Sequence, residues 1–290
     1  MARLRVSDMT VYLIPNLTKP QAAPTAAAAV DVLCAQGARV ILPADVPPEP
    51  FAGRQVSFLE ETCAFSSCDA IVTIGGDGTI LHAARRGIGF HKPLLGINIG
   101  RMGFLATVEA YELDKLARLV RGDYRIDERT LLQVNAYGAN TFRQYALNDV
   151  VISKPGLNQT IEVSITCDGI PVNQFMGDGV VVATPTGSTA YALSAGGPVL
   201  DARIAGIVMC PLCAHSMHSP PMVFSAQRKL CVRVAGRGVA GALVSCDGWA
   251  PERISFDDTV EVSLSERSVS LVSFSEADQF EAIDKKLKGR

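Results

Sequence analysis

Short apolar runs alternate with helix-compatible segments along the first third of the chain. The runs are rich in β-branched residues and have no polar face, which is typical of strands buried on both sides of a parallel sheet. Strands that alternate with helices predict an open α/β sheet, which binds ligands at the carboxyl ends of its strands. We expect strands at 10–15, 39–42, 70–74 and 93–97, and helices at 25–36, 51–63 and 80–86.

The pattern changes after Glu109. One more helix is expected at 111–120, and the runs beyond it are short, rich in Val, Ile and Thr, and separated by Gly, Asp and Pro, which predicts an all-β domain. The charged segment 276–288 has the pattern of a helix that folds back on the first domain. We therefore expect an N-terminal α/β domain over residues 1–108, completed by 276–290, and a C-terminal all-β domain over 109–275. Its strands are expected at 130–137, 144–153, 160–167, 180–184, 229–234, 242–246, 259–264 and 268–274.

The composition excludes several classes of protein. Of the 290 residues, 48% are hydrophobic and 19% are charged, which is the balance of a globular chain. A net charge of −2 provides no broad cationic surface for nucleic acid. The apolar runs are too short and interrupted to span a membrane, and no apolar leader follows Arg3 and Arg5. We expect a cytoplasmic protein that binds neither nucleic acid nor membrane.

Eight cysteines are scattered without the spacing of a disulfide framework. In a cytoplasmic chain of this size they are expected to be free thiols, most of them buried. Cys210 and Cys213 have the spacing of a redox or zinc pair. No second pair accompanies them, and a hydrophobic strand leads into them, so a structural role is expected.

Five residues between a buried strand and a helix carry the clearest chemistry: Gly75, Gly76, Asp77, Gly78 and Thr79. Glycines at such a turn let backbone N–H groups approach an oxyanion, which indicates a phosphate. A carboxylate repels phosphate, so Asp77 indicates either a metal ligand or a base that takes a proton from an attacking hydroxyl. The sequence contains neither a GxxxxGK[ST] loop nor the GxGxxG spacing, so this phosphate site is of another kind.

A second cluster follows the next parallel strand, and a third begins a later strand. Segment 96–105 contains three glycines, which predict a tight loop beside the glycine turn, and Phe104 in it can stack on a base. Asn148 and Asp149 lead an apolar strand, where a carboxylate can accept hydrogen bonds from both hydroxyls of a ribose. An Asx turn explains this pair equally well.

A fourth cluster is the segment 176–191, which contains five hydroxyl side chains. Pro185 and Gly187 predict a turn, after which Ser188 or Thr189 can cap a short helix. A helix start surrounded by hydroxyls suits ribose, adenine or phosphate. A capped helix in a tight loop, without any ligand, explains the pattern equally well.

Taken together, the four clusters resemble the NAD kinase family. The motifs GGDGT at 75–79, GINIGRMGFL at 96–105, LNDVVI at 147–152 and TPTGSTAYALSAGGP at 184–198 occur in the family's order and spacing. The resemblance covers most of residues 70–250, whereas a GGDG-type turn alone also occurs in phosphofructokinases and in diacylglycerol and sphingosine kinases. It implies a Rossmann-like N-terminal α/β domain joined to a C-terminal β-sandwich domain, in agreement with the two-part pattern.

The resemblance also implies an activity, the transfer of the γ-phosphoryl group of ATP to the 2′-hydroxyl of the adenosine ribose of NAD. Asp77 matches the family's catalytic aspartate, which accepts the proton of the attacking hydroxyl. Mg²⁺ is expected to enter with ATP and to offset the charge of the triphosphate, without fixed protein ligands. The other matching positions contact nucleotides: Gly75, Gly76, Gly78, Thr79, His82, Phe104, Asn148, Asp149, Asp178 (near the nicotinamide), Thr186, Thr189, Ala190, Tyr191, Ala192, Leu193 and Ser194.

The chain departs from the family pattern at four positions. Asp149 stands where a Glu, one methylene longer, is usual. Met176 stands where a basic residue is frequent, Pro220 where an Arg is usual, and Trp249 where a polar residue is common. We expect these departures to change affinity and the choice of phosphate donor more than the class of reaction.

Two other functions fit part of the sequence. A lipid kinase of the diacylglycerol or sphingosine type shares the glycine turn, but segments 96–105 and 184–198 and the lack of a membrane-facing stretch argue against it. A non-catalytic NAD(P)-binding sensor would not need Asp77. The sequence leaves open whether polyphosphate replaces ATP, whether NADH is accepted and whether NADP inhibits. The resemblance implies a homodimer or homotetramer.

Overall fold

The computed structural model describes residues 9–100, 103–157, 159–216, 219–236, 241–275 and 283–284. The chain forms two compact units, unit 1 from Met1–Glu128 with Val269–Arg290 and unit 2 from residues 129–268. Unit 1 thus extends beyond the boundary expected at 108, and the chain returns to it before 276. The helix expected at 276–288 lies outside the described residues except for 283–284.

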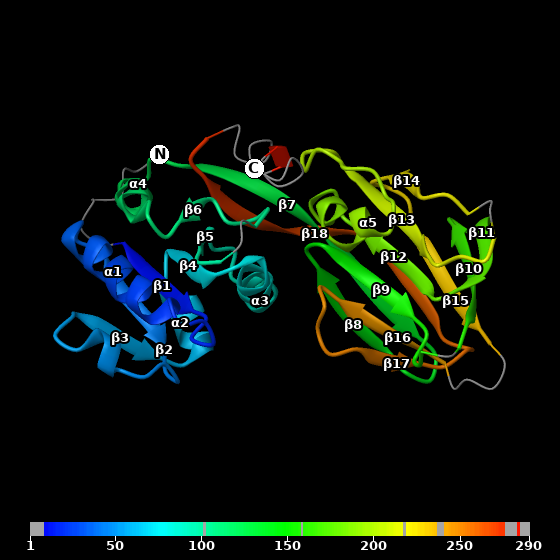
Figure 1. Cartoon of the computed structure of the whole chain (residues 1–290), viewed down its shortest axis with the longest axis horizontal. Helices are drawn as coiled ribbons and strands as arrows, with labels where there is room; N and C mark the ends of the chain where they lie inside the picture. Colours follow the sequence, from blue (N-terminus) through cyan, green and yellow to red (C-terminus); the bar gives the residue numbers. More distant parts are fainter. Residues whose placement is uncertain are drawn as a thin grey trace. The chain divides into compact units, whose positions relative to one another are not determined.

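Unit 1 contains a parallel sheet with helices on both faces (Figure 1). Its strands follow the order β18, β5, β4, β1, β2, β3, each parallel to its neighbour, with β6 also beside β5. The elements are β1 (Thr10–Pro15), α1 (Ala22–Ala35), β2 (Arg39–Pro43), η1 (Glu49–Phe51), β3 (Val56–Leu59), α2 (Glu61–Ser67), β4 (Ala70–Gly75), α3 (Asp77–Gly87), β5 (Leu94–Asn98), β6 (Val108–Glu109), η2 (Leu113–Lys115), α4 (Leu116–Arg121) and the end of β18 (Thr259–Ser273).

The alternation of side chains along the strands assigns the helices of unit 1 to faces. Val11 and Leu13 of β1 share a buried cluster with residues of α1 and α4. Tyr12 points to the opposite face, where its ring meets the edge of Phe65 on α2 at 5.2 Å between centroids. Phe65 also stacks on Phe90, just after α3. The packing of α4 with α1 explains why unit 1 extends past residue 108.

The helix expected at 51–63 is wrong. η1 ends at Phe51, and Gly53 has a φ of +78°, a left-handed conformation that interrupts the helical path. Val56–Leu59 then forms β3, which pairs with β2, and α2 begins only at Glu61. Val56 and Phe58 lie on one side of β3 and pack against the core of unit 1, so the period of two outweighed the helix-compatible composition.

Unit 2 is a β-sandwich. One sheet contains β11, β10, β15 and β18 together with β7 and β8, and the other has the order β14, β13, β12, β9, β16, β17. A single buried cluster draws its residues from both sheets, which confirms the expected sandwich. The elements are β7 (Arg125–Tyr137), β8 (Phe142–Ala146), β9 (Asp149–Ser153), β10 (Ile161–Cys167), β11 (Ile170–Gly177), β12 (Gly179–Ala183), η3 (Thr186–Thr189), α5 (Tyr191–Ser194), β13 (Gly206–Leu212), β14 (Met222–Ser225), β15 (Leu230–Ala235), β16 (Ala242–Cys246), β17 (Glu252–Ile254) and the first part of β18.

Three strand expectations in unit 2 differ from the structure. β7 begins at Arg125, before the expected start at 130. The run 144–153 is two strands, β8 and β9, because the chain turns at Leu147 and Asn148. The runs 259–264 and 268–274 form one continuous strand, β18. The boundary between the two units falls within β7 and again within β18, so the chain passes from one unit to the other inside a strand each time.

The eight cysteines are free thiols. Cys210 is buried in β13, whereas Cys213 is exposed and has a φ of +46°. Among the described residues, no three His, Cys, Asp or Glu side chains gather into a group that could hold a metal ion. None of the helices in the described part of the chain is long and apolar enough to cross a membrane.

Candidate functional site

The candidate site of unit 1 lies where the sheet changes its winding direction. β1 and β4 are neighbours, but β1 leads into α1 on one face and β4 leads into α3 on the other. Loops that leave adjacent strands toward opposite faces open a crevice at the carboxyl edge, which is the usual ligand site of such sheets. The loop after β1 is 16–21, and the glycine turn follows β4.

Thr79 ties these two loops together. Its Oγ1 accepts hydrogen bonds from the Gly76 N–H and from the Asn16 Nδ2, each at 3.4 Å. Gly75 is buried, and a Cβ on it would overlap the Thr79 side chain. Gly78 is exposed, with open space where a Cβ would stand. Gly75 therefore serves packing inside the turn, whereas Gly78 leaves its backbone accessible.

Asp77 lies against the segment that follows β5. Its carboxylate accepts hydrogen bonds from the Phe104 N–H at 2.8 Å and the Leu105 N–H at 3.2 Å. A Cβ on Gly103 would overlap the same carboxylate. The structure thus brings Phe104 beside Asp77, while residues 101–102 of this motif lie outside the described part. A carboxylate has about four lone-pair positions, so Asp77 can hold this segment and still accept a proton.

Lys19 is a functional candidate that the sequence analysis missed. Its Nζ lies 3.2 Å from the Cβ position of Gly76 and 3.1 Å from that of Gly100. No described residue pairs with this ammonium group. A cation beside the exposed backbone of a glycine turn provides an anion site. The available signal was the position of Asn16–Pro20 directly after the first strand, on the ligand-binding edge of the sheet.

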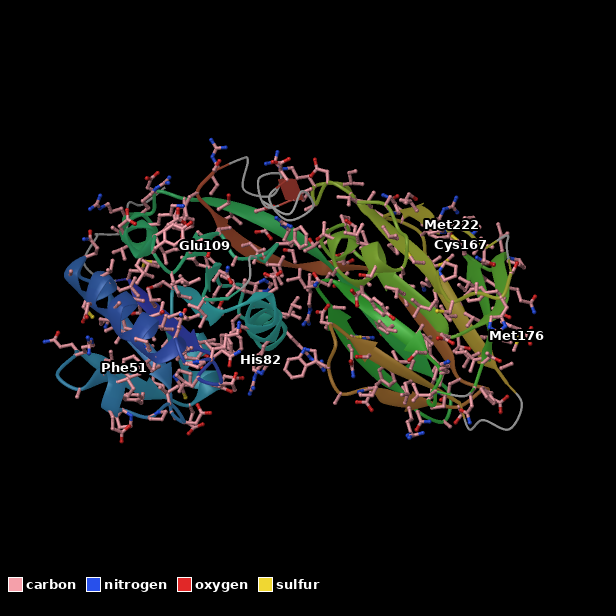
Figure 2. All side chains as sticks on the ribbon, viewed as in Figure 1. Phe51, His82, Glu109, Cys167, Met176 and Met222 are labelled. Atoms are coloured by element: carbon pink, nitrogen blue, oxygen red, sulfur yellow. The ribbon has the colours of Figure 1, made fainter. Side chains whose placement is uncertain are left out.

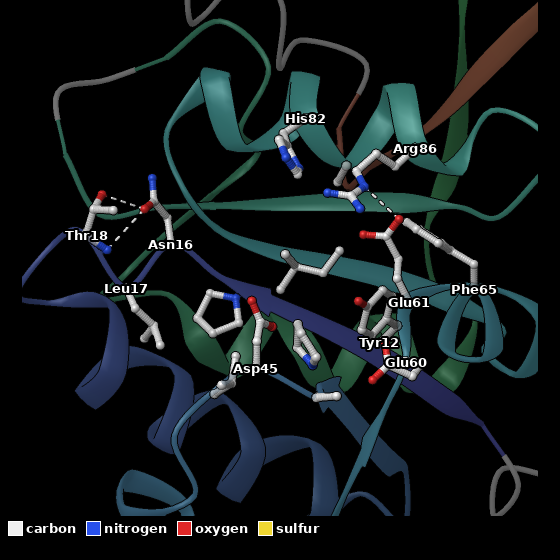
Figure 3. Close-up of a pocket in the computed structure, with 16 residues that line it drawn as sticks. Tyr12, Asn16, Leu17, Thr18, Asp45, Glu60, Glu61, Phe65, His82 and Arg86 are labelled. Atoms are coloured by element: carbon white, nitrogen blue, oxygen red, sulfur yellow. Dashed lines mark hydrogen bonds and ion pairs between the residues drawn. The ribbon is translucent and has the colours of Figure 1, made fainter.

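A cavity of about 640 Å³ adjoins the loop after β1 (Figure 3). His82 points into it from α3, and Asp45 and Glu60 line it from the segments after β2 and β3. Burial, and to a smaller extent the charge of Arg86, lower the pKa of His82 below its ordinary value of 6.5. His82, which was predicted to contact a ligand, thus lines a cavity of the size that small molecules occupy.

The candidate site of unit 2 is organised by Asp247, which the sequence analysis also missed. Its carboxylate accepts hydrogen bonds from three consecutive backbone N–H groups, those of Leu147 at 2.7 Å, Asn148 at 2.8 Å and Asp149 at 3.1 Å. Asp247 itself has a φ of +50° and follows β16. The available signal was an Asp-Gly pair after an apolar strand, which predicts a turn.

Asp149 is a buried carboxyl with only 6% of its surface exposed. Burial, followed by the negative charge of Asp247, raises the pKa of Asp149 from its ordinary value of 3.8 to about 7. The backbone N–H of Tyr191 donates to the carboxylate and acts in the opposite direction. The structure therefore brings together Asn148, Asp149 and the start of α5, three of the elements that the motifs indicated.

Replacing Asp149 with Asn is expected to flatten the dependence of stability on pH. Below pH 3.8 the carboxyl is protonated in both the folded and unfolded states. Between 3.8 and about 7 the unfolded chain releases the proton while the folded chain keeps it, so the free energy of unfolding falls as pH rises through this window. Urea titrations of both proteins from pH 4 to pH 8 measure this, and an unchanged slope in Asp149→Asn would contradict the raised pKa.

The hydroxyls of segment 184–189 mostly hold the loop itself. Thr184 Oγ1 donates to the Leu147 carbonyl at 2.6 Å and accepts from the Gly187 N–H at 3.0 Å. A Cβ on Gly187 would overlap the Asn148 carbonyl oxygen, so the close approach of this loop to the Asn148 turn requires glycine. Thr186 Oγ1 accepts from the buried Arg129 Nη1 at 3.3 Å.

The expected side-chain cap on α5 is wrong. The residue before the helix is Ala190, and no side chain caps it. Ser188 Oγ instead donates to the Pro185 carbonyl at 2.6 Å and accepts from the Leu200 N–H at 2.9 Å. Thr189 Oγ1 donates to the Thr186 carbonyl at 3.1 Å. These bonds form because residues 186–189 are a 3₁₀ turn, which places each hydroxyl beside a carbonyl of the preceding turn.

Asp178 lies between β11 and β12, where it forms an ion pair with Lys154 at 2.6 Å. The Lys154 N–H also donates to the Asp178 carbonyl at 2.9 Å. Met176, at the departure from the family pattern, is 40% exposed on β11 (Figure 2). Lys154 thus places a cation beside Asp178 although the position of Met176 provides none.

Comparisons with known proteins agree with this arrangement. The model of the ATP-NAD kinase N-terminal domain matches residues 11–124, and that of the ATP-NAD kinase C-terminal domain matches residues 147–274. An NAD kinase of Corynebacterium diphtheriae is 36% identical over 274 residues, which cover 91% of this chain and 86% of that protein. NAD kinase 2 of Streptomyces coelicolor is 37% identical over 244 residues, 82% of this chain and 81% of that protein.

Solved structures show the same fold over nearly the whole chain. The crystal structure of yeast NADH kinase complexed with NADH matches with a TM-score of 0.87 and 25% identity, covering 97% of this chain and 87% of that one. An NAD kinase from Archaeoglobus fulgidus in complex with ATP shares the fold at a TM-score of 0.72 and 24% identity, covering 97% of this chain and all of that one, 100%. The four ordered motifs, the two domain matches and these relatives show that the chain belongs to the ATP-NAD kinase family.

Proposed function

We propose that this protein transfers the γ-phosphoryl group of ATP to the 2′-hydroxyl of the adenosine ribose of NAD and so makes NADP. The observation that carries the proposal is the pairing of Asp77 with an anion site in the same crevice of unit 1. Phosphoryl transfer to a hydroxyl needs both a proton acceptor and a cradle for the phosphates. Membership of the ATP-NAD kinase family supports NAD and ATP as the substrates.

In this proposal Asp77 accepts the proton of the 2′-hydroxyl as its oxygen attacks the γ-phosphorus. The bond between the γ-phosphorus and the oxygen that bridges it to the β-phosphate breaks, and ADP leaves. Gly76 and Gly78 present backbone to the phosphates, and Lys19 offsets their charge. Mg²⁺ enters with the substrate as MgATP and neutralises part of the triphosphate.

Unit 2 is proposed to bind the nucleotide that accepts the phosphoryl group. The amide of Asn148 can bind the adenine, and the carboxylate of Asp149 can accept hydrogen bonds from ribose hydroxyls. Asp178 and its partner Lys154 offer a carboxylate and a cation for the nicotinamide half. Asp149 stands in place of the usual Glu, and the backbone N–H of Tyr191 donates to its carboxylate.

A cytoplasmic location and assembly as a homodimer or homotetramer are further proposals from the family resemblance. Light scattering on the purified protein tests the assembly. A single species with the mass of one chain, 30.8 kDa, at micromolar concentration would contradict it.

Incubation of the pure protein with NAD, ATP and Mg²⁺ tests the activity itself. We expect NADP and ADP to form in equal amounts, with NADP measured by a dehydrogenase that is specific for it. Phosphorylation of diacylglycerol or sphingosine without NADP would instead support the lipid-kinase alternative. Binding of NAD without any turnover would support the sensor alternative.

A further inference from the structure

The cavity of unit 1 has walls suited to a flat ring. It lies at the carboxyl ends of β1 and β2, and Pro43 and Val46 are among the residues that line it. Tyr12 and Phe65 also line it, each is only 1% exposed, and their rings pack edge to face. A preformed apolar wall of this kind binds a heterocycle without ordering new side chains.

The charges of the cavity select against phosphate. Three carboxylates line it, those of Asp45, Glu60 and Glu61. Only Glu61 has an ion-pair partner among the described residues, since Arg86 Nε lies 2.6 Å from its Oε1. Asp45 and Glu60 therefore remain as hydrogen-bond acceptors that repel anions and bind hydroxyl or amino groups. A ribose diol and an exocyclic amine have this chemistry.

Beyond one side of the acidic cavity lies a positive charge, that of Lys19. Asn16 lines that side and donates through Nδ2 to Thr79 in the glycine turn. Lys19, three residues further along the same loop, extends its ammonium group to the backbone positions of Gly76 and Gly100. A single short loop in unit 1 thus separates the acidic cavity from the anion-binding site at Lys19.

We propose that the cavity binds the nucleoside of the phosphate donor, with Asp45 and Glu60 accepting hydrogen bonds from its ribose and amino groups. The triphosphate leaves the cavity past Asn16, is held by Lys19, and reaches the glycine turn with its terminal phosphate. The inference rests on the proposed function, because it identifies which part of unit 1 recognises ATP. It predicts that the protein prefers a nucleoside triphosphate to inorganic polyphosphate.

Calorimetric binding of MgATP and of magnesium tripolyphosphate separates the two parts of this path. The double variant Asp45→Asn, Glu60→Gln is expected to weaken MgATP binding about ten-fold or more and not to weaken tripolyphosphate binding. Lys19→Gln is expected to weaken the binding of both. Glu49→Gln is the matched control, because Glu49 is an exposed carboxylate in the segment between β2 and β3 that does not line the cavity.

Kinetics supply a second measurement. In the double variant, KM for ATP should rise while KM for NAD stays unchanged, and 2′-deoxy-ATP should lose part of its disadvantage against ATP. MgATP binding as tight as in Glu49→Gln would overturn the nucleoside site. Tripolyphosphate binding unaffected by Lys19→Gln would overturn the role of Lys19. If MgATP binding responds as expected but the wild-type protein makes no NADP, the proposed function fails and the donor site stands.

Discussion

Replacing Asp77 with Asn is expected to lower kcat for NADP formation by about two to four orders of magnitude. The ribose hydroxyl is a poor nucleophile at neutral pH, and an amide cannot accept its proton as the oxygen attacks phosphorus. KM for ATP and for NAD should change far less than kcat, because the side chain keeps its size and position. Steady-state kinetics with NADP detection measure both constants.

Asp77 also holds the backbone of Phe104 and Leu105, so the kinetic experiment needs a control for this structural role. Its carboxylate accepts from the N–H groups of Phe104 and Leu105, and an Asn side chain offers only one acceptor oxygen for these two donors. Hydrogen exchange of these two amides reports how far the segment loosens. Gly103→Ala forces the same segment away from an intact carboxylate, since its Cβ would overlap Asp77. A near-normal kcat in Asp77→Asn would remove Asp77 from the mechanism, whatever happens to the segment.

Replacing Asp247 with Ala is expected to lower the free energy of unfolding by about 2–4 kcal/mol. The change leaves three consecutive N–H groups of the Leu147–Asp149 turn without their acceptor. It also removes a negative charge that raises the pKa of Asp149, so this pKa should move down toward its ordinary value. Urea unfolding at pH 7 measures the first effect, and a pH series of the same titration measures the second.

Asp168 provides a matched comparison within unit 2. It has the same φ of +50° and also precedes a glycine, but its carboxylate accepts from one backbone N–H, that of Lys229, and pairs with the exposed Arg228. Asp168→Ala is therefore expected to cost about 1 kcal/mol or less. Equal losses in the two variants would show that Asp247 stabilises the protein through its backbone conformation instead of its three hydrogen bonds.

The elements that could be predicted are those whose residue pattern fits only one kind of secondary structure. The buried strands of unit 1 are continuous apolar runs, and β4 and β5 were predicted to within one residue of the observed ends. β3 was missed because its four residues are too short for their alternation to outweigh a helix-compatible neighbourhood. The change of pattern after Glu109 indicated two domains, but the boundary expected at 108 was too early, because the packing of α4 on α1 joins residues distant in sequence.

The candidate site also contains residues that local motifs identify and residues that only the folded chain brings into place. The motifs identified the turns at Asp77 and at Asn148, because the residues within each turn are by themselves of the types that bind phosphate or ribose. Lys19 and Asp247 were missed because each acts on a turn far along the chain, which only the sheet topology brings near. The hydroxyls of segment 184–189 fitted a ligand site and a tight loop equally well, and the structure uses most of them for hydrogen bonds within the loop.

Unit 1 is discontinuous in sequence, and this limits how the gene can be recombined. The end of β18 pairs with β5 through Leu271 and Leu94, Val272 lies in the core of unit 1, and Phe274 lies under the Arg118 guanidinium. A fragment that stops near residue 128 would lack this strand and expose the edge of β5. An exchange of the first unit between two members of the family therefore requires two crossovers, one within β7 and one within β18. Because β7 and β18 each contribute residues to both units, an insertion or deletion in either strand would shift its pairing in both units.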